Sequence, residues 1–488
     1  MLPRPSIAGK NLKDFDRNLF NTDIDISGVT INAQAVKAGD LFIALSGAKT
    51  HGLNYVAEAI ANGAVAVLSD KSEEISIPLF VAKDAKSLVG KIAAWYYEEP
   101  FAKLIAIGVT GTNGKTTTVN LVKQLWQLSG KTTGVIGTIG TEIDQANYPA
   151  VRTTPEASEL QSIAALMLQK KVTHLAMEVS SHALMQERVN GAFFKIAAFT
   201  NLTQDHLDFH GSMDNYFAAK SKLFRDDLSQ SAVINLDDSY GLKLFASIKD
   251  KATSVSRISP AGQWHFQKVE NKNDGFDVEI INEQKELISA HFPLLGEHNL
   301  DNLIMAVAIA VKSGLTTAEI NKAIPNLKSV AGRLEQLKLG QDFNALVDYA
   351  HTPDAVERVL SAAKRFTSGR VIAILGCGGD RDKGKRPHMG AALKNNSEIA
   401  IFTSDNPRSE SPDQILKEMV GNLEIFSPNS VIADRRDAIK YAVSIAQEGD
   451  SIMLLGKGHE TGQEVNGQIT PFNDVTELRD AILKVVNK

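Results

Sequence analysis

Cysteine is almost absent from this 488-residue sequence, which contains only Cys377. A single cysteine excludes an internal disulfide framework and is typical of a reducing compartment. The sequence also lacks any run approaching the roughly 18 apolar residues that are needed to span a bilayer. Residues 1–20 contain no apolar core of signal-peptide length. These absences predict a soluble, cytoplasmic protein that is not inserted into a membrane.

An excess of basic charge is missing as well. The sequence has 52 Lys and Arg residues against 57 Asp and Glu residues, a formal net charge of -5 at pH 7. Without a global positive field the chain is not expected to bind nucleic acid, and an anionic substrate must be held by local basic clusters. Hydrophobic residues make up 43% of the chain and charged residues 22%, the usual balance of a soluble globular protein.

Short apolar runs alternate with amphipathic stretches along most of the chain. This pattern is typical of α/β units with mainly parallel sheets, and the length predicts about three domains. Breaks at 98–100 and 332–335 place these domains at 1–98, 99–333 and 334–488. The polar, alternating stretch 250–292 predicts antiparallel hairpins attached to the central domain. The expected strands are 41–47, 64–70, 79–83, 104–109, 174–179, 195–200, 231–236, 345–349, 370–376, 399–403 and 451–456, and the expected helices are 54–61, 85–97, a long one from 115, 299–313 and 317–324.

The strongest local motif is the glycine-rich segment 108–117, GVTGTNGKTT, between an apolar strand and a helix. Glycines let the backbone turn so that successive amides face phosphate oxygens, and the helix N-terminus adds a favourable dipole. In such a loop Lys115 reaches the β- and γ-phosphates and the Thr116 hydroxyl binds Mg²⁺. Val109 stands where the strict pattern has glycine. A turn that only joins strand to helix is the alternative, but the strand–loop–helix context favours a nucleoside triphosphate site.

Polar side chains follow two further apolar strands of the same domain. Glu178 ends HLAMEV, and His206 lies in the segment after KIAAFT. The carboxyl ends of parallel strands are where an open α/β sheet places its ligand. Glu178 is therefore a candidate to bind Mg²⁺ together with Thr116. From chemistry alone, His206 is more readily explained as a satisfied structural histidine, and Lys220 as an exposed helix lysine.

A family resemblance rests on seven motifs, namely GTNGKTT (111–117), MEVSSH (177–182), TNLTQDHLDFHG (200–211), YFAAK (216–220), GEHNLDN (296–302), AGRLE (331–335) and DYAHTPD (348–354). In order and spacing they resemble the Mur ligases. The resemblance implies a UDP-sugar-binding domain, a central ATPase domain and a C-terminal Rossmann-like domain that binds the amino acid. It also implies that Cys377 has no chemical role and is a buried thiol.

The resemblance implies roles for the central residues. Lys115, Lys220, Glu178 and His206 are expected to be catalytic, and Lys220 is expected to carry a carbamate derived from CO₂. The expected metal ligands are Thr116, Glu178, Lys220 and His206. ATP is expected to be held by Gly111, Thr112, Asn113, Gly114, Lys115, Thr116, Thr117, Asn302, Arg333 and Asp348.

Within the family, GCGGDRDKGKRP (376–387), SDNPRSE (404–410) and GKGHE (456–460) resemble the members that add meso-diaminopimelate to UDP-N-acetylmuramoyl-L-alanyl-D-glutamate. The UDP-linked dipeptide is expected to contact Thr153, Thr154, Ser180, Gln186 and Arg188. The incoming amino acid is expected to contact Arg381, Asp405, Asn406, Pro407, Arg408, Gly456 and Glu460. The implied partners are small molecules only, and a monomer is expected.

The N-terminal domain departs from the family pattern. Asn32-Ala33-Gln34 stands where the family usually has an Asp-Ser-Arg triplet that helps to bind the UDP group. Ile31 and Ala33 are expected to contact the substrate there, with help from Lys49 or Thr50.

The implied reaction is ATP-dependent amide-bond formation through an acyl phosphate. The alternatives inside the family are a ligase selective for L-lysine and a folylpolyglutamate synthase, and the tetrapeptide at 405–408 argues against both. A nucleotide-switched binding protein without ligase activity is the alternative from another class. Such a switch has no use for an amino-acid pocket that contains Arg381 and Arg408.

Overall fold

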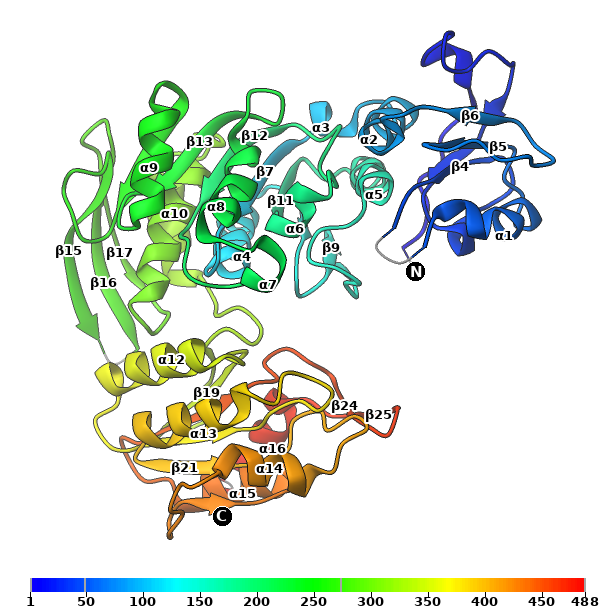
Figure 1. Ribbon diagram of the computed structural model, residues 1–488. Helices are drawn as coiled ribbons and strands as arrows, with labels where there is room; N and C mark the ends of the chain where they lie inside the picture. The colour runs from blue at the N-terminus through cyan, green and yellow to red at the C-terminus, as the bar shows by residue number, and fades with distance from the viewer. Residues whose placement is uncertain (1, 48–49, 273, 487–488) are drawn as a thin grey trace. The chain divides into compact units, whose positions relative to one another are not determined.

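Alternating apolar and polar segments build three main sheets, as shown by the computed structural model, which describes residues 2–47, 50–272 and 274–486 (Figure 1). Each sheet is mainly parallel, and helices connect most of the parallel strands, so the predicted α/β class is confirmed. The chain forms two compact units. The first contains Met1–Val269, Asp277–His291 and Leu300–Asn326, and the second contains Glu270–Phe276, Phe292–Asn299 and Leu327–Lys488. The boundaries at residues 98 and 333 stay predictions.

The N-terminal sheet has four parallel strands in the order β3–β4–β5–β6. Alternate side chains of β4 enter two different cores, because successive residues of a strand point to opposite faces. Leu41 and Ile43 pack in the core lined by α2, while Phe42 and Ala44 pack in the core lined by α1. The elements of this region are β1 Lys10–Asn11, β2 Asp25–Ile26, β3 Gly28–Thr30, β4 Asp40–Ala44, α1 Val56–Ala61, β5 Ala66–Ser69, β6 Leu79–Val81 and α2 Ala85–Tyr96, with 3₁₀ turns at Leu12–Asp14, Ala33–Ala35 and Gly52–Tyr55.

The central sheet has eleven strands in the order β10–β9–β8–β11–β7–β12–β13–β14–β15–β16–β17. Its strands are β7 Ile105–Thr110, β8 Thr133–Ile136, β9 Thr141–Ile143, β10 Ala146–Tyr148, β11 His174–Glu178, β12 Phe194–Phe199, β13 Ser229–Asn235, β14 Ala252–Ser256, β15 Trp264–Lys272, β16 Gly275–Ile281 and β17 Leu287–Phe292. The accompanying helices are α3 Pro100–Lys103, α4 Lys115–Leu128, α5 Ala157–Gln169, α6 Ser181–Met185, α7 Leu207–His210, α8 Met213–Ser221, α9 Ser239–Ser247, α10 His298–Lys312 and α11 Thr317–Ala323, with 3₁₀ turns at Lys222–Phe224, Lys249–Lys251 and Ile324–Asn326.

Three parallel strands at the middle of this sheet end together. Glu178 of β11 lies opposite Val109 of β7, and Phe199 of β12 lies opposite Thr110. The loops that follow β7, β11 and β12 therefore leave the sheet at one edge, where the predicted phosphate and metal residues are found.

One expectation for this sheet is wrong in part. Residues 250–292 were expected to form antiparallel hairpins, but β14 pairs parallel with both β13 and β15. A parallel pair leaves no hairpin at this point, and Ser256 connects to Trp264 through a short irregular segment. Alternation of polar and apolar residues indicates that one face of a sheet is exposed. It does not indicate whether the neighbouring strand is parallel or antiparallel.

The C-terminal sheet has six strands in the order β18–β19–β23–β20–β21–β22 and is parallel apart from β18. Val371, Ala373 and Leu375 of β20 face the core beneath α12–α14, while Ile372 and Ile374 face the core beneath α15 and α16. The elements are β18 Glu335–Leu337, β19 Asn344–Asp348, α12 Pro353–Phe366, β20 Val371–Leu375, α13 Lys385–Asn396, β21 Ile399–Phe402, α14 Pro412–Val420, β22 Ser430–Val431, α15 Arg435–Ile445, β23 Ser451–Leu455, the hairpin β24 Gly462–Val465 and β25 Gln468–Pro471, and α16 Asp474–Val486. Among the described residues, no helix is long and apolar enough to cross a membrane.

Candidate functional site

The glycine-rich loop connects β7 to α4, and the end of β12 fixes its shape. The backbone N–H of Asn113 donates to Asn201 Oδ1 at 2.9 Å, and the Thr200 hydroxyl donates to the Asn113 carbonyl at 2.6 Å. Gly114, with φ of +83°, immediately precedes the first residue of α4. A side chain at Gly111 would place its Cβ 1.9 Å from Thr200 Oγ1, so only glycine fits there. The loop is therefore held open at the N-terminus of a helix, where anions bind.

Two lysine ammonium groups meet at one carbonyl of this loop. Lys115 Nζ donates to the Gly111 carbonyl at 2.9 Å, and Lys220 Nζ donates to the same oxygen at 2.7 Å. Lys220 is only 1% exposed and lies 4.6 Å from the centroid of the Tyr216 ring. Burial, reinforced by the charge of Lys115, lowers the pKa of Lys220 well below its usual value. Lys220 is thus a buried amine, and its interpretation as an exposed helix lysine is wrong.

Glu178 is a buried carboxylate at the end of β11. Its Oε2 accepts hydrogen bonds from Thr116 Oγ1 at 2.9 Å and from Thr138 Oγ1 at 3.2 Å, and its Oε1 accepts one from the Thr138 N–H at 2.8 Å. The structure therefore brings Thr116 and Glu178 together, as expected. Carboxylate and hydroxyl oxygens are the ligand type that Mg²⁺ prefers, so the donor set fits that ion.

His206 lies at the surface end of a histidine cluster. Its side chain is 48% exposed, its φ is +51°, and its ring centroid lies 5.0 Å from that of His182. His210 is buried and stacks on Tyr216 at 4.7 Å between centroids, while its Nε2 lies 3.0 Å from Ser181 Oγ. His210 is thus the satisfied structural histidine, whereas His206 has an accessible ring. Among the described residues no group of three or more His, Cys, Asp or Glu side chains forms a metal site. The expected set contains only two such side chains, so its metal role stays a prediction.

The residues expected to contact the UDP-linked dipeptide form a chain of contacts beside Glu178. The Thr154 hydroxyl donates to the Glu178 carbonyl at 3.0 Å and accepts from the Ser180 N–H at 3.1 Å. Arg188 donates to Gln186 Oε1 and pairs with Glu156 at 3.0 Å. Thr153 Oγ1 lies 3.1 Å from Thr138 Oγ1. The structure thus brings Thr153, Thr154, Ser180, Gln186 and Arg188 to one region next to the phosphate loop.

The altered N-terminal triplet forms a short 3₁₀ turn. Asn32 caps this turn by accepting the Gln34 N–H at 3.1 Å, and Ala33 is buried, with its carbonyl accepting from Asn62. The half-buried Ile31 precedes the turn. Thr50 is exposed and its hydroxyl lies 3.3 Å from the Tyr55 hydroxyl, while Lys49 lies outside the described residues. Asn32 therefore stabilises the turn, and the UDP contacts stay predictions.

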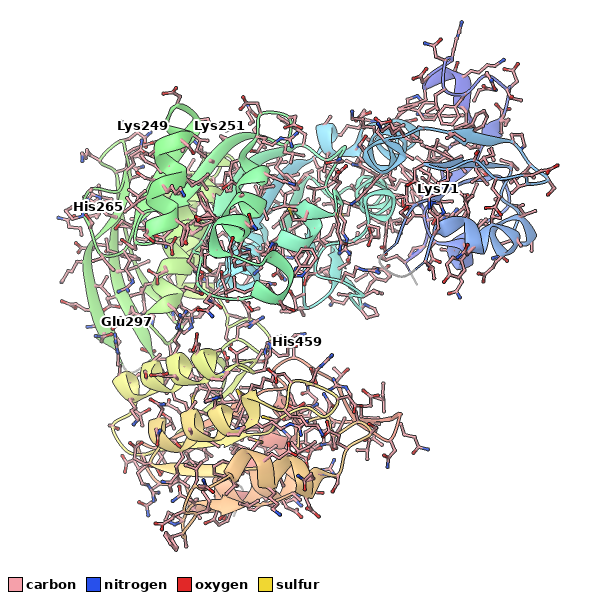
Figure 2. All side chains as sticks on the ribbon, viewed as in Figure 1. Lys71, Lys249, Lys251, His265, Glu297 and His459 are labelled. Atoms are coloured by element: carbon pink, nitrogen blue, oxygen red, sulfur yellow. The ribbon has the colours of Figure 1, made fainter. Side chains whose placement is uncertain are left out.

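The predicted nucleotide residues occupy separate places in the two units. Asn302 lies in the first unit, buried in α10, where its Oδ1 accepts from Thr118 Oγ1 at 3.3 Å. In the second unit both carboxylate oxygens of Asp348 accept backbone N–H groups, from Leu334 and Ala350. Arg333 lies 5.2 Å from the Tyr349 ring centroid, and His459, labelled in Figure 2, packs on the same ring at 5.1 Å. Backbone N–H groups thus orient the Asp348 carboxylate, while Arg333 lies against an aromatic ring.

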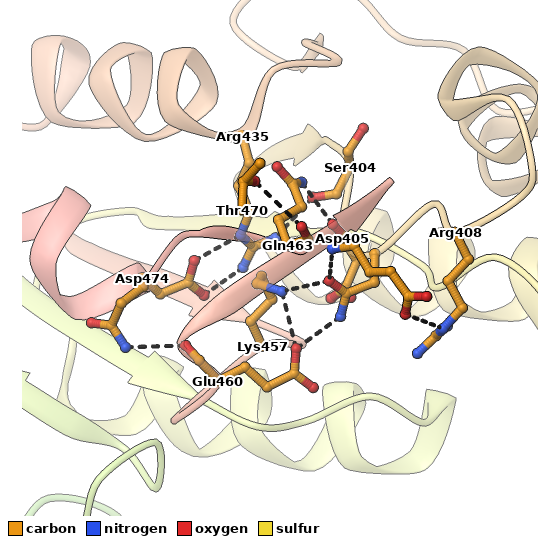
Figure 3. A network of polar contacts seen from close by, with 12 residues as sticks. Ser404, Asp405, Arg408, Arg435, Lys457, Glu460, Gln463, Thr470 and Asp474 are labelled. Carbon is orange, nitrogen blue, oxygen red and sulfur yellow. Dashed lines mark hydrogen bonds and ion pairs between the residues drawn. The ribbon is translucent and has the colours of Figure 1, made fainter. Parts of the chain in front are cut away.

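Several of the residues predicted to bind the amino acid form one polar network at the carboxyl ends of β20, β21 and β23 (Figure 3). Asn406 Nδ2 donates to Glu460 Oε2 at 2.8 Å. Arg408, with φ of +52° and a side chain that is 24% exposed, donates to the Gly379 carbonyl at 2.7 Å and pairs with Glu464 at 3.3 Å. Pro407 is buried between Asn406 and Arg408, whereas Arg381 is exposed on the neighbouring loop. Arg408 thus faces the network, and the helix that follows starts only at Pro412.

A buried ion pair lies beneath this network. Arg435 and Asp474 are both fully buried and pair at 2.6 Å, and Arg435 also donates to the carbonyls of Ser404 and Leu455. These two carbonyls precede Asp405 and Gly456, so the pair fixes both loops. Burial raises the pKa of Asp405, and the charges of Lys457 and Arg435 oppose that rise. Gly456, with φ of +106°, lets the chain pass beside the Asp405 carboxylate.

Three members of the network were missed by sequence reasoning. Lys457 Nζ donates to Asn406 Oδ1 at 3.1 Å and to Glu460 Oε2 at 3.0 Å. Gln463 and Glu464, from β24, contact the Asp405 carbonyl and Arg408. Lys457 lies inside the motif GKGHE, where a lysine between two glycines at a strand end was a usable signal. Nothing in the sequence marks the hairpin residues, because their partners lie more than 50 positions away.

Three profiles of known families match the chain. The profile of the Mur ligase family catalytic domain matches residues 25–96, that of the Mur ligase middle domain matches 109–310, and that of the Mur ligase glutamate ligase domain matches 332–458.

Similar full-length proteins carry a common name, UDP-N-acetylmuramoyl-L-alanyl-D-glutamate–2,6-diaminopimelate ligase. The protein of that name from Streptomyces avermitilis is 40% identical over 474 residues, which cover 94% of this chain and 93% of the relative. The one from Caldanaerobacter subterraneus is 41% identical over 458 residues, covering 93% and 94%. A solved structure with this name aligns with a TM-score of 0.72 at 33% identity, covering 98% of this chain and 99% of that chain.

Proposed function

The chain belongs to the Mur ligase family, and from that premise we propose that it is an ATP-dependent ligase that joins meso-diaminopimelate to UDP-N-acetylmuramoyl-L-alanyl-D-glutamate. The name shared by relatives of about 40% identity supports this substrate pair. The observation that carries the proposal is the convergence of Lys115, Lys220, Thr116 and Glu178 at one edge of the central sheet. The reaction belongs to the synthesis of the peptidoglycan precursor, and we place it in the cytoplasm with the chain as a monomer.

In the first step the γ-carboxylate of the D-glutamyl residue attacks the γ-phosphorus of ATP. A bond forms between a carboxylate oxygen and that phosphorus, the bond to the β-bridging oxygen breaks, and ADP leaves. The product is an acyl phosphate. Lys115 and the amides of the glycine-rich loop hold the phosphates and neutralise the charge of the transferring group.

Mg²⁺ and a lysine carbamate complete this site in the proposal. Thr116 and Glu178 would hold one Mg²⁺, and Glu178, His206 and an oxygen of a carbamate on Lys220 would hold a second. When bound, the metal neutralises the negative charge of the phosphoryl oxygens. The depressed pKa of Lys220 supports the carbamate, because only a neutral amine combines with CO₂, and a lysine with an ordinary pKa is almost fully protonated at pH 7.

In the second step an amine of diaminopimelate attacks the acyl carbon. The new C–N bond forms, the bond from carbon to the phosphate oxygen breaks, and inorganic phosphate leaves. The attacking nitrogen releases its excess proton. Arg381, Asp405, Asn406, Arg408 and Glu460 would bind the amino acid. Asp405 and Glu460 suit an ammonium group, and Arg408 suits the distal carboxylate that lysine lacks. Exclusion of water protects the acyl phosphate from hydrolysis.

A ligase for L-lysine is the second candidate within the family. The partly exposed guanidinium of Arg408 favours diaminopimelate, because a distal carboxylate can accept its remaining N–H groups, whereas lysine offers no acceptor there and leaves Glu464 as the anionic partner of Arg408.

The test is phosphate release from ATP measured with each substrate omitted in turn. We expect full turnover only when the UDP-linked dipeptide and diaminopimelate are both present, with a new amide product found by mass spectrometry. Phosphate release that is indifferent to both substrates would instead identify a nucleotide-dependent switch. Turnover with L-lysine exceeding that with diaminopimelate would replace the proposed amino acid and leave the ligase assignment in place.

A further inference from the structure

Lys457 is a fully buried lysine in the loop that follows β23. Its ammonium donates to Asn406 Oδ1 at 3.1 Å and to Glu460 Oε2 at 3.0 Å, and Asn406 Nδ2 donates to the same Glu460 oxygen at 2.8 Å. The three side chains therefore form a closed triangle of hydrogen bonds (Figure 3). A buried ammonium is costly unless it is paired, and an apolar residue would fill the same space at lower cost. Packing alone therefore gives no reason for a lysine at this position.

The triangle leaves one side of Glu460 available. The Glu460 side chain is 32% exposed, and the hydrogen bonds that its carboxylate accepts from Lys457 and Asn406 both end at Oε2. Among the described residues no donor reaches Oε1, although an ionised carboxylate has room for further bonds on that oxygen. The main chain is held as well, since the Glu460 N–H donates to the Lys457 carbonyl and Asn473 donates to the Glu460 carbonyl. Glu460 Oε1 is thus held in a fixed position, where it can accept a hydrogen bond from a ligand.

We propose that Lys457 is a positioning residue that holds Glu460 so that Oε1 receives the distal ammonium of the incoming amino acid. This inference rests on the proposed function, because it requires a substrate with a second ammonium group. Lys457 does not touch the substrate and acts only through Glu460 and Asn406.

The charges of the network leave room for one more cation. Arg435 and Asp474 neutralise each other as a buried pair, and Arg408 pairs with Glu464. Lys457 then balances one of the two remaining carboxylates, Asp405 and Glu460, and a substrate ammonium balances the other. The positive charge of Lys457 also repels that ammonium, so two effects of opposite sign compete. Removal of Lys457 weakens amino-acid binding if positioning dominates and strengthens it if repulsion dominates.

The experiment compares wild type with Lys457→Met in the full-length protein. Two amino acids are used, meso-diaminopimelate and 2-aminopimelate, which keeps both carboxylates and lacks the distal ammonium. We expect the KM for diaminopimelate to rise roughly 10-fold or more, as for loss of a fixed hydrogen bond to a charged group. The preference for diaminopimelate over 2-aminopimelate should fall by a similar factor. The KM values for ATP and for the UDP-linked dipeptide should not change.

A double-variant cycle separates positioning from a purely structural role. In a Glu460→Gln background the carboxylate charge that Lys457 positions is already lost, so adding Lys457→Met should raise the KM for diaminopimelate no further. Lys440→Met is the matched control, because Lys440 lies in α15 of the same unit and is 50% exposed. The control should have wild-type KM values. If Lys457→Met does not fold, Lys457→Gln replaces it, since glutamine removes the charge and retains polarity, and the same direction of change is expected.

An unchanged or lowered KM for diaminopimelate in a folded Lys457 variant would overturn the inference. Additive losses in the double variant would overturn it too, because they would show that Lys457 does not act through Glu460. Equal use of diaminopimelate and 2-aminopimelate by wild type would also refute it while leaving the ligase function standing. Failure of wild type to form an amide with any amino acid would instead remove the proposed function.

Discussion

The local sequence predicts that Lys220 is an exposed helix lysine, whereas the structure buries its side chain. Its amine lies 2.7 Å from the Gly111 carbonyl, and Lys115 donates to the same oxygen. Two ammonium groups at one carbonyl repel each other in a region that excludes water, which favours a neutral amine at Lys220. This is the state from which a carbamate forms.

Lys220→Arg should therefore be nearly inactive, although the substitution conserves charge. A guanidinium stays protonated and cannot become a carbamate, so we expect a loss on the order of 100-fold or more in turnover. The measurement is substrate-dependent phosphate release. Lys222→Arg, two residues along the chain, is the control, because Met185 Sδ at 3.4 Å is the one hydrogen-bond partner of the Lys222 ammonium among the described residues. An arginine variant that retains most of its activity would show that Lys220 carries no carbamate.

Arg408 should determine the choice between diaminopimelate and L-lysine. Its guanidinium is 24% exposed and is oriented by the Gly379 carbonyl and Glu464. Loss of a bidentate contact to the distal carboxylate costs a few kcal/mol, which corresponds to roughly 100-fold in selectivity. We expect Arg408→Ala to lower kcat/KM for diaminopimelate and to leave that for lysine little changed.

Arg436→Ala is the matched control for that substitution, because Arg436 is 48% exposed in α15 and pairs with Glu477. Undiminished selectivity in Arg408→Ala would remove Arg408 from the amino-acid site and leave the ligase function intact.

The sequence predicts the place of a site residue well where a motif and the order of the strands are enough to locate it. Thr116 and Glu178 were expected to lie together, and the Thr116 hydroxyl donates to Glu178 Oε2 at 2.9 Å. The burial of Lys220 could not be predicted, because α8 has no clear apolar face and the carbonyl that its amine contacts lies in a loop 109 positions away. Gln463 and Glu464 were missed for the same reason. Contacts over such separations depend on tertiary packing, which local patterns do not encode.

The proposed role of helix α4 in phosphate binding depends on its first turn. Gly114 precedes the helix with φ of +83°, and a Cβ there would lie 2.4 Å from Asn302 Oδ1. Gly114→Ala should therefore distort the phosphate loop and raise the KM for ATP. Gly130 follows the other end of the same helix with φ of +77° and open space around it. Gly130→Ala carries similar backbone strain, roughly 1 kcal/mol, and should leave the KM for ATP unchanged. Equal effects of both substitutions on the KM would contradict the role given to the loop.

The strands were predicted where they are long and buried on both faces. The expected strands at 174–179 and 451–456 correspond to β11 and β23, which have five residues each and are buried throughout. The short strands β9, β10 and β22, which lie at or next to a sheet edge, were not expected, because two or three residues are too few to show a periodic pattern. The parallel pairing of β14 with β15 was missed because alternation is common to both strand directions.

The stability of the first unit should depend on pH through His174. This histidine is 6% exposed at the start of β11, lies 4.9 Å from the Trp126 ring, and has a pKa lowered by burial to about 4. Because the unfolded chain takes up a proton near pH 6.5 and the folded chain does not, stability is complete above that pH and is lost as pH falls toward 4.

The expected loss is on the order of 3 kcal/mol, from a pKa that falls from 6.5 to about 4. We expect the urea midpoint of the first unit to fall less between pH 7 and pH 4.5 in His174→Gln than in wild type. Equal falls in the two proteins would show that other groups control acid stability.

The proposed function depends on an acyl phosphate that forms at the glycine-rich loop of the central sheet. The most direct measurement uses UDP-N-acetylmuramoyl-L-alanyl-D-glutamate whose γ-carboxylate carries ¹⁸O in both positions, with ATP and diaminopimelate. The oxygen that attacks phosphorus leaves with the phosphate, so the account predicts one ¹⁸O atom in each phosphate released and one in the amide product. Phosphate free of ¹⁸O would contradict it, because ATP would then be hydrolysed without activation of the carboxylate.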